Sequence, residues 1–337
     1  SIVGYVFSEQ MLTLLGTPAE QLPLAKSYLQ ITFIGILFLF GYNFISTVLR
    51  AIGDSKSPLR FVMIAVVLNT FLDPLFISGF NLGIEGAAIA TILSQGLAFL
   101  YGMFYVLRNK LVPFQIPYLP KFSEVKLILN LGIPAGLQMS VISAGSAAIM
   151  SVVTMFGSAV VGGFGAAQRI DSISMLPAHA LGTAVNSMAG QNIGKQNWKR
   201  VHEIAKYGLM YNLAIMSLIG VIVFIFAEYL VMMFIREQAS VAFATTYLRI
   251  MAFCFPLLGI NFILNGVVRA SGAMYQVLVL NIISFWVLRY PLTFLFAKLL
   301  GDIGIAVGHG VSFLISSILA AGYYKFGKWK EKELFTS

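Results

Sequence analysis

The chain has 337 residues, of which 58% are hydrophobic and only 10% are charged. Soluble domains carry about 45–50% apolar and about 25% charged residues, so this chain has too few charges for a surface that faces water, and lipid must cover it. Its net charge of +9 is spread over short segments without interleaved aromatic residues, which argues against nucleic acid as a partner. Cys254 is the single cysteine, so a disulfide framework and a cysteine-based metal cluster are excluded.

Apolar segments long enough to cross a membrane recur along the whole chain. A helical span of the hydrocarbon core needs about 20 apolar residues. A shorter apolar run at 1–15 is expected to be the end of a further helix. The fold class is therefore all-α, a polytopic membrane protein. Nine full spans are predicted, at 25–49, 60–80, 84–107, 128–155, 159–189, 205–234, 242–267, 275–299 and 303–324.

Basic residues alternate between the connections that join these spans. The segments rich in Lys and Arg lie near 50–60, 108–126, 195–206 and 325–332. The positive-inside rule predicts that they and the C-terminus are cytoplasmic, in an inner (plasma) membrane. Three prolines break the polar stretch 111–126, which we interpret as the linker between two halves, 1–118 and 119–337.

The two halves share an internal repeat, in which residues 1–53 align without a gap with residues 220–272. Tyr-Leu-x-Ile at 28–31 recurs at 247–250, and Arg-Ala-x-Gly at 50–53 recurs at 269–272. Such repeats are typical of transporters. The second copy is preceded by helices that the first lacks, so we expect a longer parent with about a hundred further N-terminal residues, two helices and most of a third. The alternative is an asymmetric protein of nine helices.

Short motifs in a fixed order extend this pattern along the chain. The motifs are Leu49-Arg-Ala-x-Gly53-Asp54-x-x-x-Pro58, Asn69-x-x-x-Asp73-Pro74, Gly83-x-x-Gly86-Ala87-Ala88-x-Ala90-Thr91, Asn130-Leu-Gly-Ile-Pro134, Gly165-Ala-Ala-Gln168-Arg169 and Gly190-Gln191-Asn192-x-Gly194. In this order and spacing, they make the chain resemble a transporter of the multidrug and toxic compound extrusion (MATE) family.

This resemblance implies a fold of twelve helices in two six-helix bundles. Residues 1–118 would be the remnant of the N-terminal bundle, and residues 119–337 would hold the complete C-terminal bundle and a cytoplasmic tail. It also implies export of hydrophobic, often cationic compounds in exchange for protons or sodium ions. We therefore expect a monomer in contact with lipid, no catalysis, and no cofactor beyond the coupling ion.

Charges inside a membrane span are costly and mark functional candidates. Four residues stand out, namely Asp73, Arg169, Asp171 and Arg289. Asn69 lies four residues before Asp73 and so on the same helical face. Pro74 cannot donate a hydrogen bond, which predicts a kink and a freed carbonyl. A carboxylate, an amide and a carbonyl on one turn suit a sodium ion or a proton.

The resemblance to MATE transporters adds residues from a second helix to this candidate site. Asp73, Asn69, Thr91 and the carbonyl of Ala87 correspond to the cation site in the N-terminal half of MATE transporters, which also uses an acid on a first helix that this chain lacks. The alternative is a carboxylate that pairs structurally with an arginine. Some branches place acids for sodium at positions that are approximately Ile142 and Leu258 here, so the chain looks more like the proton-coupled branch allied to the DNA-damage-inducible F proteins.

The remaining polar residues in the spans are secondary candidates. Arg169 and Asp171 are two residues apart, so their side chains diverge. Asp171 is either a second proton carrier or, as we favour, the structural partner of Arg289. Polar residues that could line a substrate cavity are Asn43, Ser46, Gln138, Ser143 and Gln168.

Two other functions compete with the antiporter. A flippase for a lipid-linked sugar would line its cavity with several arginines, for which the chain offers mainly Arg169 and Arg289. The positions of these two residues therefore discriminate between the two functions. An intramembrane enzyme would need a nucleophile with a base, or a metal cluster, and the sequence shows no such set with helical spacing.

Overall fold

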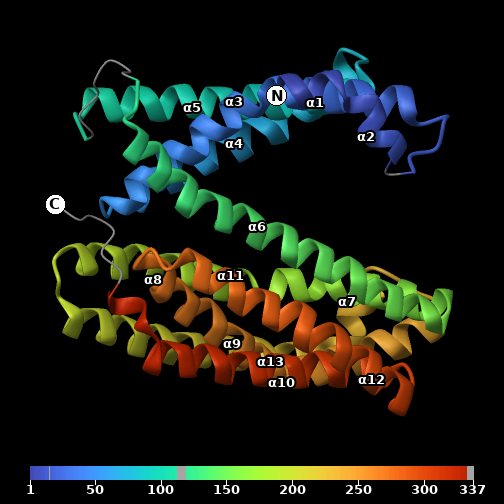
Figure 1. The fold of residues 1–337 in the computed structure, drawn as a ribbon. Helices are drawn as coiled ribbons and strands as arrows, with labels where there is room; N and C mark the ends of the chain where they lie inside the picture. The colour runs from blue at the N-terminus through green and yellow to red at the C-terminus, as the bar shows by residue number, and fades with distance from the viewer. Residues whose placement is uncertain (15, 112–118, 332–337) are drawn as a thin grey trace. The chain divides into compact units, whose positions relative to one another are not determined.

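The computed structural model describes residues 1–14, 16–111 and 119–331, and in these residues the regular secondary structure is entirely helical. The chain divides into two compact units, Ser1–Tyr118 and Leu119–Ser337 (Figure 1). Each unit is described separately below.

The N-terminal unit is built on two long helices that pack against a third. It contains α1 (Ile2–Val6), α2 (Ser8–Leu14), α3 (Leu22–Ala51), α4 (Lys56–Pro74), a π-helical turn η1 (Leu75–Gly79) and α5 (Gly83–Arg108). Helices α3 and α4 both pack against α5. Their small core contains Ile45, Leu49, Phe61 and Val106, and the Phe61 ring meets Tyr101 and Tyr105 edge-on.

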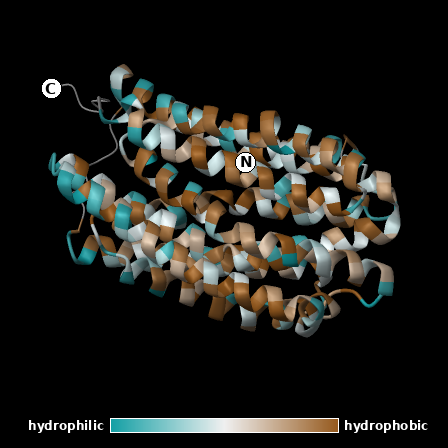
Figure 2. Ribbon diagram, turned by 90° about the horizontal axis from the view of Figure 1, so that it is seen from below, coloured by the Kyte–Doolittle hydropathy of each residue, from teal (hydrophilic) through white to brown (hydrophobic). Residues whose placement is uncertain are grey.

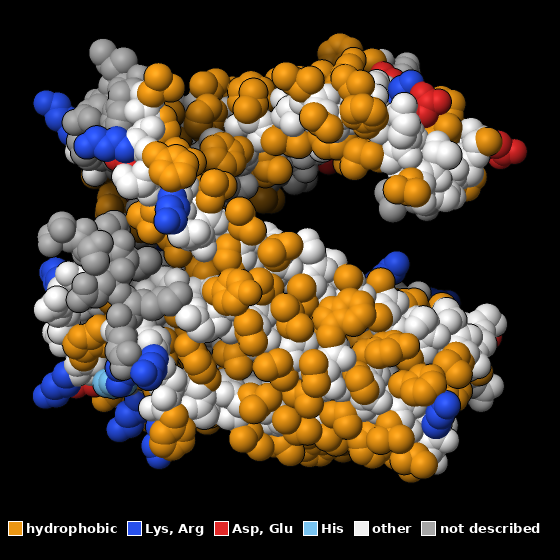
Figure 3. Space-filling view, in the orientation of Figure 1, with side chains coloured by type: hydrophobic (Ala, Val, Ile, Leu, Met, Phe, Trp, Pro, Cys, Tyr) orange, Lys and Arg blue, Asp and Glu red, His pale blue; other side chains and the backbone are white. Residues whose placement is uncertain are grey.

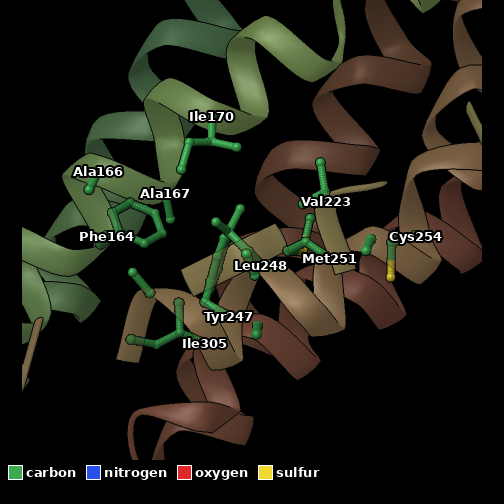
Figure 4. Packing of buried hydrophobic residues seen from close by; sticks show 14 of the residues in the cluster. Phe164, Ala166, Ala167, Ile170, Val223, Tyr247, Leu248, Met251, Cys254 and Ile305 are labelled. Carbon is green, nitrogen blue, oxygen red and sulfur yellow. The ribbon is translucent and has the colours of Figure 1, made fainter. Parts of the chain in front are cut away.

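The C-terminal unit is arranged around one central helix, α10, which packs against α7, α8, α9 and α13. Its core brings α7 and α10 together through Phe164, Tyr247 and Leu248 (Figure 4). The elements are α6 (Phe122–Val153), η2 (Thr154–Phe156), α7 (Ser158–Ser174), α8 (Leu176–Gly194), α9 (Trp198–Met232), α10 (Gln238–Ala270), α11 (Met274–Ile282), η3 (Ile283–Arg289), α12 (Tyr290–Leu300), α13 (Ile303–Phe326) and η4 (Lys328–Glu331).

Hydrophobic residues, brown in Figure 2, recur along the helices of both units. Large residues such as Leu37, Phe71 and Phe253 are more than two-thirds exposed. Lys and Arg gather mainly toward helix ends on the face drawn in Figure 3. An apolar surface of this extent is suited to lipid, as the composition predicts.

Eight helices in the described chain are long and apolar enough to cross a membrane. They match eight of the nine predicted spans. The exception is 159–189, where the structure has two helices, α7 and α8, separated at Met175. Pro177 lies in the first turn of α8 and has no N–H with which to continue the hydrogen bonds of α7. The prediction of nine uninterrupted spans is therefore corrected at this segment.

The sequence predicts a kink and a freed carbonyl at Pro74, and the helical hydrogen-bonding pattern changes at this residue. Helix α4 ends at this proline and continues as the π-helical turn η1. In the second unit, a π-helical turn, η3, likewise lies directly before Tyr290 and Pro291. Such turns are rare and occur frequently at functional sites.

Candidate functional site

Four predicted site residues meet between α4 and α5 in the N-terminal unit. Asn69 Nδ2 donates to Asp73 Oδ1 at 3.1 Å and to Thr91 Oγ1 at 3.4 Å. Thr91 Oγ1 in turn donates to the carbonyl oxygen of Ala87 at 2.9 Å. A chain of hydrogen bonds therefore joins a carboxylate, an amide, a hydroxyl and a backbone carbonyl.

Local sequence explains why the two helices come close enough for this contact. Asn69 and Asp73 are one helical turn apart on α4 and so share a face. On α5, Gly86 lies so close to η1 that a Cβ there would be 2.8 Å from the backbone carbonyl of Phe76. Ala88 and Ala90 are buried on the same helix. Small residues let helix backbones approach within a membrane, which brings Thr91 to Asn69.

The donor set suits a hard cation or a proton. Carboxylate, amide, hydroxyl and carbonyl oxygens are the ligands that hard cations prefer. Among the described residues, Asp73 takes part in no ion pair. The salt bridge that these residues contain joins Lys26 to Glu9 at 2.7 Å. A structural pairing of Asp73 with an arginine is therefore absent from the described chain. The same part of the chain holds no group of three His, Cys, Asp or Glu side chains that could bind a metal.

The predicted secondary charges are not paired with one another. Arg289 is buried, only 7% exposed, with its guanidinium 3.8 Å from the Phe285 ring centroid and 4.3 Å from that of Phe313. No ion pair links Asp171 to Arg289 within the described residues, so the favoured structural pairing is wrong. The cation is stacked between aromatic rings instead. Arg169 is exposed and lies 5.8 Å from the Phe234 ring centroid.

The predicted cavity residues have different environments. Gln138 is buried, and its Oε1 accepts a hydrogen bond from Arg269 Nη2 at 3.0 Å, so it joins α6 to α10. Ser46 is also buried, whereas the other three are exposed. Those three are Asn43, Ser143 and Gln168.

Sequence reasoning missed the pairing of Arg269 with Gln138. The repeat signalled Arg269, because it aligns with Arg50, but the two arginines differ in environment. Arg50 Nη2 donates to Thr47 Oγ1 at 3.1 Å on its own helix.

Comparison with known proteins places the chain in a family. The MatE family profile matches residues 1–75 and 134–295. The chain is 62% identical over 333 residues to the probable multidrug resistance protein YpnP of Bacillus subtilis (strain 168), covering 99% of this chain and 75% of that protein. It is 28% identical over 325 residues to the probable multidrug resistance protein NorM of Thermotoga maritima, covering 93% of this chain and 69% of that protein.

Solved structures show the same fold. The crystal structure of the Vibrio cholerae MATE transporter VcmN in the bent form superposes with a TM-score of 0.92 at 24% identity, over 99% of this chain and 76% of that one. The helical fold, the profile match and the identity to YpnP agree. The chain belongs to the MatE family, a family of membrane transporters and not of enzymes.

Proposed function

We propose that the protein is an antiporter that exports hydrophobic and cationic compounds in exchange for entering protons or sodium ions. Relatives named as multidrug resistance proteins support the export of drugs. The observation that carries the coupling is the contact of Asn69 with both Asp73 and Thr91 beside the interrupted helix α4. A charged group in a membrane span with neutral oxygen ligands around it is what cation coupling needs.

In this mechanism Asp73 takes up the proton or sodium ion. Asn69 orients one carboxylate oxygen and, with Thr91 and the Ala87 carbonyl, supplies neutral oxygens for a sodium ion. A coupling cation drives a conformational change only through its different affinities for the two states. The π-helical turn after Pro74 is an element that can rearrange as the charge of Asp73 changes.

We place the protein in the plasma membrane as a monomer with a cytoplasmic C-terminus. The alternation of Lys and Arg between the connections supports this orientation. The eight apolar helices support a multi-pass protein in contact with lipid.

The positions of two arginines favour the antiporter over a lipid-linked sugar flippase. Such a flippase needs several arginines along its cavity. Arg289 is buried against two phenylalanine rings of the C-terminal unit, which leaves Arg169 as the exposed member of the pair.

Removal of one neutral ligand is expected to weaken cation dependence without abolishing transport. In proteoliposomes, Asn69→Ala and Thr91→Ala should each raise the cation concentration for half-maximal efflux about tenfold, since a hydrogen bond to a charged group contributes about 1.5 kcal/mol. Thr70→Ala is the matched control, because Thr70 lies beside Asn69 but donates to Val66 O on its own helix. Equal cation dependence in all three variants and the wild type would remove Asn69 and Thr91 from the site.

A further inference from the structure

The C-terminal unit carries a groove that the proposed coupling site does not use. Helix α10 packs against both α9 and α13, and a pocket of about 590 Å³ is lined by all three helices. Ile250, Cys254 and Leu257 line it at helical spacing, so one face of α10 forms its floor. Phe224 of α9 and Leu314 of α13 also line it, so the two neighbouring helices form its walls.

The groove is apolar and opens at the surface of the unit. Phe224, Phe253 and Leu314 line it and are 41%, 72% and 45% exposed. All three lie in helices that are long and apolar enough to cross a membrane. The volume of the groove falls within the range of about 300–1,000 Å³ that is typical of ligand sites. Its lining is therefore suited to an acyl chain.

One charged side chain interrupts this apolar lining. Arg249 of α10 is exposed, and its guanidinium lies 5.9 Å from the Phe224 ring centroid. It forms no ion pair within the residues that the structure describes. The Thr246 hydroxyl and the Cys254 thiol in the same lining each donate to a backbone carbonyl of α10 itself. A charge in a membrane span is costly, so an arginine without an acidic partner marks a functional candidate.

The acid closest to this groove along α9 does not neutralise Arg249. Glu228 lies one turn after Phe224 and therefore on the same face of α9. It is exposed, and no ion pair joins it to Arg249 in the described chain. The lining residues from α13 carry no charge. A cation beside an apolar groove is complementary to a ligand with an anionic head and an apolar tail.

The position of Arg249 along α10 suits a lipid headgroup. Helix α10 has 33 residues, so it is about 50 Å long, whereas the hydrocarbon core is about 30 Å thick. Arg249 lies about 16 Å from the start of the helix. For a helix centred in the core, this is about 6 Å inside the boundary, from where an arginine side chain extends toward the headgroups.

The apolar part of the groove continues from Arg249 toward the middle of the membrane. Ala239 of α10 and Ile303 of α13 line one other pocket, so these two helices start at the same end of the unit. A Cβ at Gly310 of α13 would lie 2.9 Å from Cys254 Sγ, which places these residues at one level. Leu314 is one turn further along α13, and so lies about 14 Å deeper than Arg249.

We propose that this groove binds an anionic phospholipid, with its phosphate at Arg249 and one acyl chain along Cys254 and Leu314. The proposed orientation of the protein makes this a lipid of the outer leaflet. Acyl chains cover any membrane helix, so the selective element is the guanidinium, whose planar fork can donate two hydrogen bonds to a phosphate. The site lies wholly in the C-terminal unit and does not depend on cation coupling at Asp73.

Fluorescence quenching by lipids with brominated acyl chains tests the site in the full chain. Leu314→Trp places a reporter where the acyl chain is proposed to lie. In nanodiscs of unbrominated phosphatidylcholine, brominated phosphatidylglycerol should half-quench the introduced tryptophan at a mole fraction at least about fivefold lower than brominated phosphatidylcholine, because hydrogen bonds between charged groups are the strong ones. Protein without the substitution gives the background of the native tryptophans.

Two matched controls locate the effect. Arg249→Gln should make the two half-quenching points equal, whereas Arg169→Gln should leave the fivefold difference unchanged. Arg169 is also exposed, lies equally far from the start of its helix and is 5.8 Å from a phenylalanine ring centroid, but it does not line the groove. Leu218→Trp, at a 63% exposed position of α9 outside the groove, should show no preference between the two lipids.

Three results would overturn the proposal. They are equal half-quenching points in Leu314→Trp with Arg249 intact, a preference that survives in Arg249→Gln, and no quenching by either lipid, as a second protein surface over the groove would cause. If Leu314→Trp does not fold, native mass spectrometry of the unsubstituted protein and Arg249→Gln with an equal mixture of the two lipids gives the answer. Bound phosphatidylglycerol should fall at least about fivefold in Arg249→Gln, and equal binding would contradict the site.

Discussion

The Asp73→Asn variant is expected to fold and insert normally but to lose gradient-driven efflux by at least about 100-fold, as the loss of a charged or proton-transferring group does. Asparagine keeps the size of the side chain and can still hydrogen-bond to Asn69. It can neither release a proton nor present a charge to sodium. Efflux from proteoliposomes under imposed proton and sodium gradients, normalised to folded protein, measures the effect.

A purely structural role for Asp73 predicts the opposite pattern. Thermal stability and yield would fall, while the surviving protein would transport with normal dependence on pH and sodium. Glu228→Gln serves as the control, because Glu228 is an exposed carboxylate on α9. Full coupling in Asp73→Asn would exclude Asp73 as the coupling residue.

Gly308→Ala in α13 is expected to destabilise the C-terminal unit. A Cβ at Gly308 would lie 2.5 Å from Thr293 Cα and 2.7 Å from its backbone nitrogen. These are backbone atoms of α12, so the two helices must move apart. Overpacking of this kind costs about 1–3 kcal/mol, occasionally more.

Thermal unfolding in detergent measures this cost. Gly165→Ala is the matched control, since no atom lies within 4 Å of a Cβ there. Its expected effect is neutral or stabilising, because alanine favours a helix over glycine by up to about 1 kcal/mol. Equal melting temperatures for Gly308→Ala and the wild type would show that α12 and α13 are not packed this closely.

The membrane helices and part of the site could be predicted because they depend on local spacing. A run of apolar residues long enough for the bilayer identifies a span whatever it packs against. Asn69 and Asp73 share a face because they are four residues apart on one helix. Thr91 is on another helix, so its place beside Asn69 followed from the family resemblance and not from spacing. The close packing of α5 against η1 at Gly86 can be recognised only when the position of the Phe76 backbone is known.

The errors arose where packing between helices decides the outcome. Hydropathy reflects apolar side chains but not backbone hydrogen bonds. It therefore predicts one continuous span over 159–189, although the sequence has a proline at Pro177 and the helix breaks at Met175. Charge alone suggests an acidic partner for Arg289, but the aromatic rings of Phe285 and Phe313 lie against its guanidinium. The hydrogen bond of Gln138 with Arg269, 131 residues later in the chain, could not be predicted from spacing.

The expected N-terminal extension of the chain stays a prediction. The alignment to YpnP covers 75% of that protein and nearly all of this chain. The proposed site in α4 and α5 lies in described residues.

The most direct test of the account is substrate efflux from proteoliposomes as the cation gradient is imposed, dissipated and reversed. Coupling predicts that efflux follows an inward proton or sodium gradient, stops when an ionophore dissipates it, and turns into uptake when the gradient is reversed. Efflux that continues at the same rate without any cation gradient would contradict cation-coupled antiport by this protein.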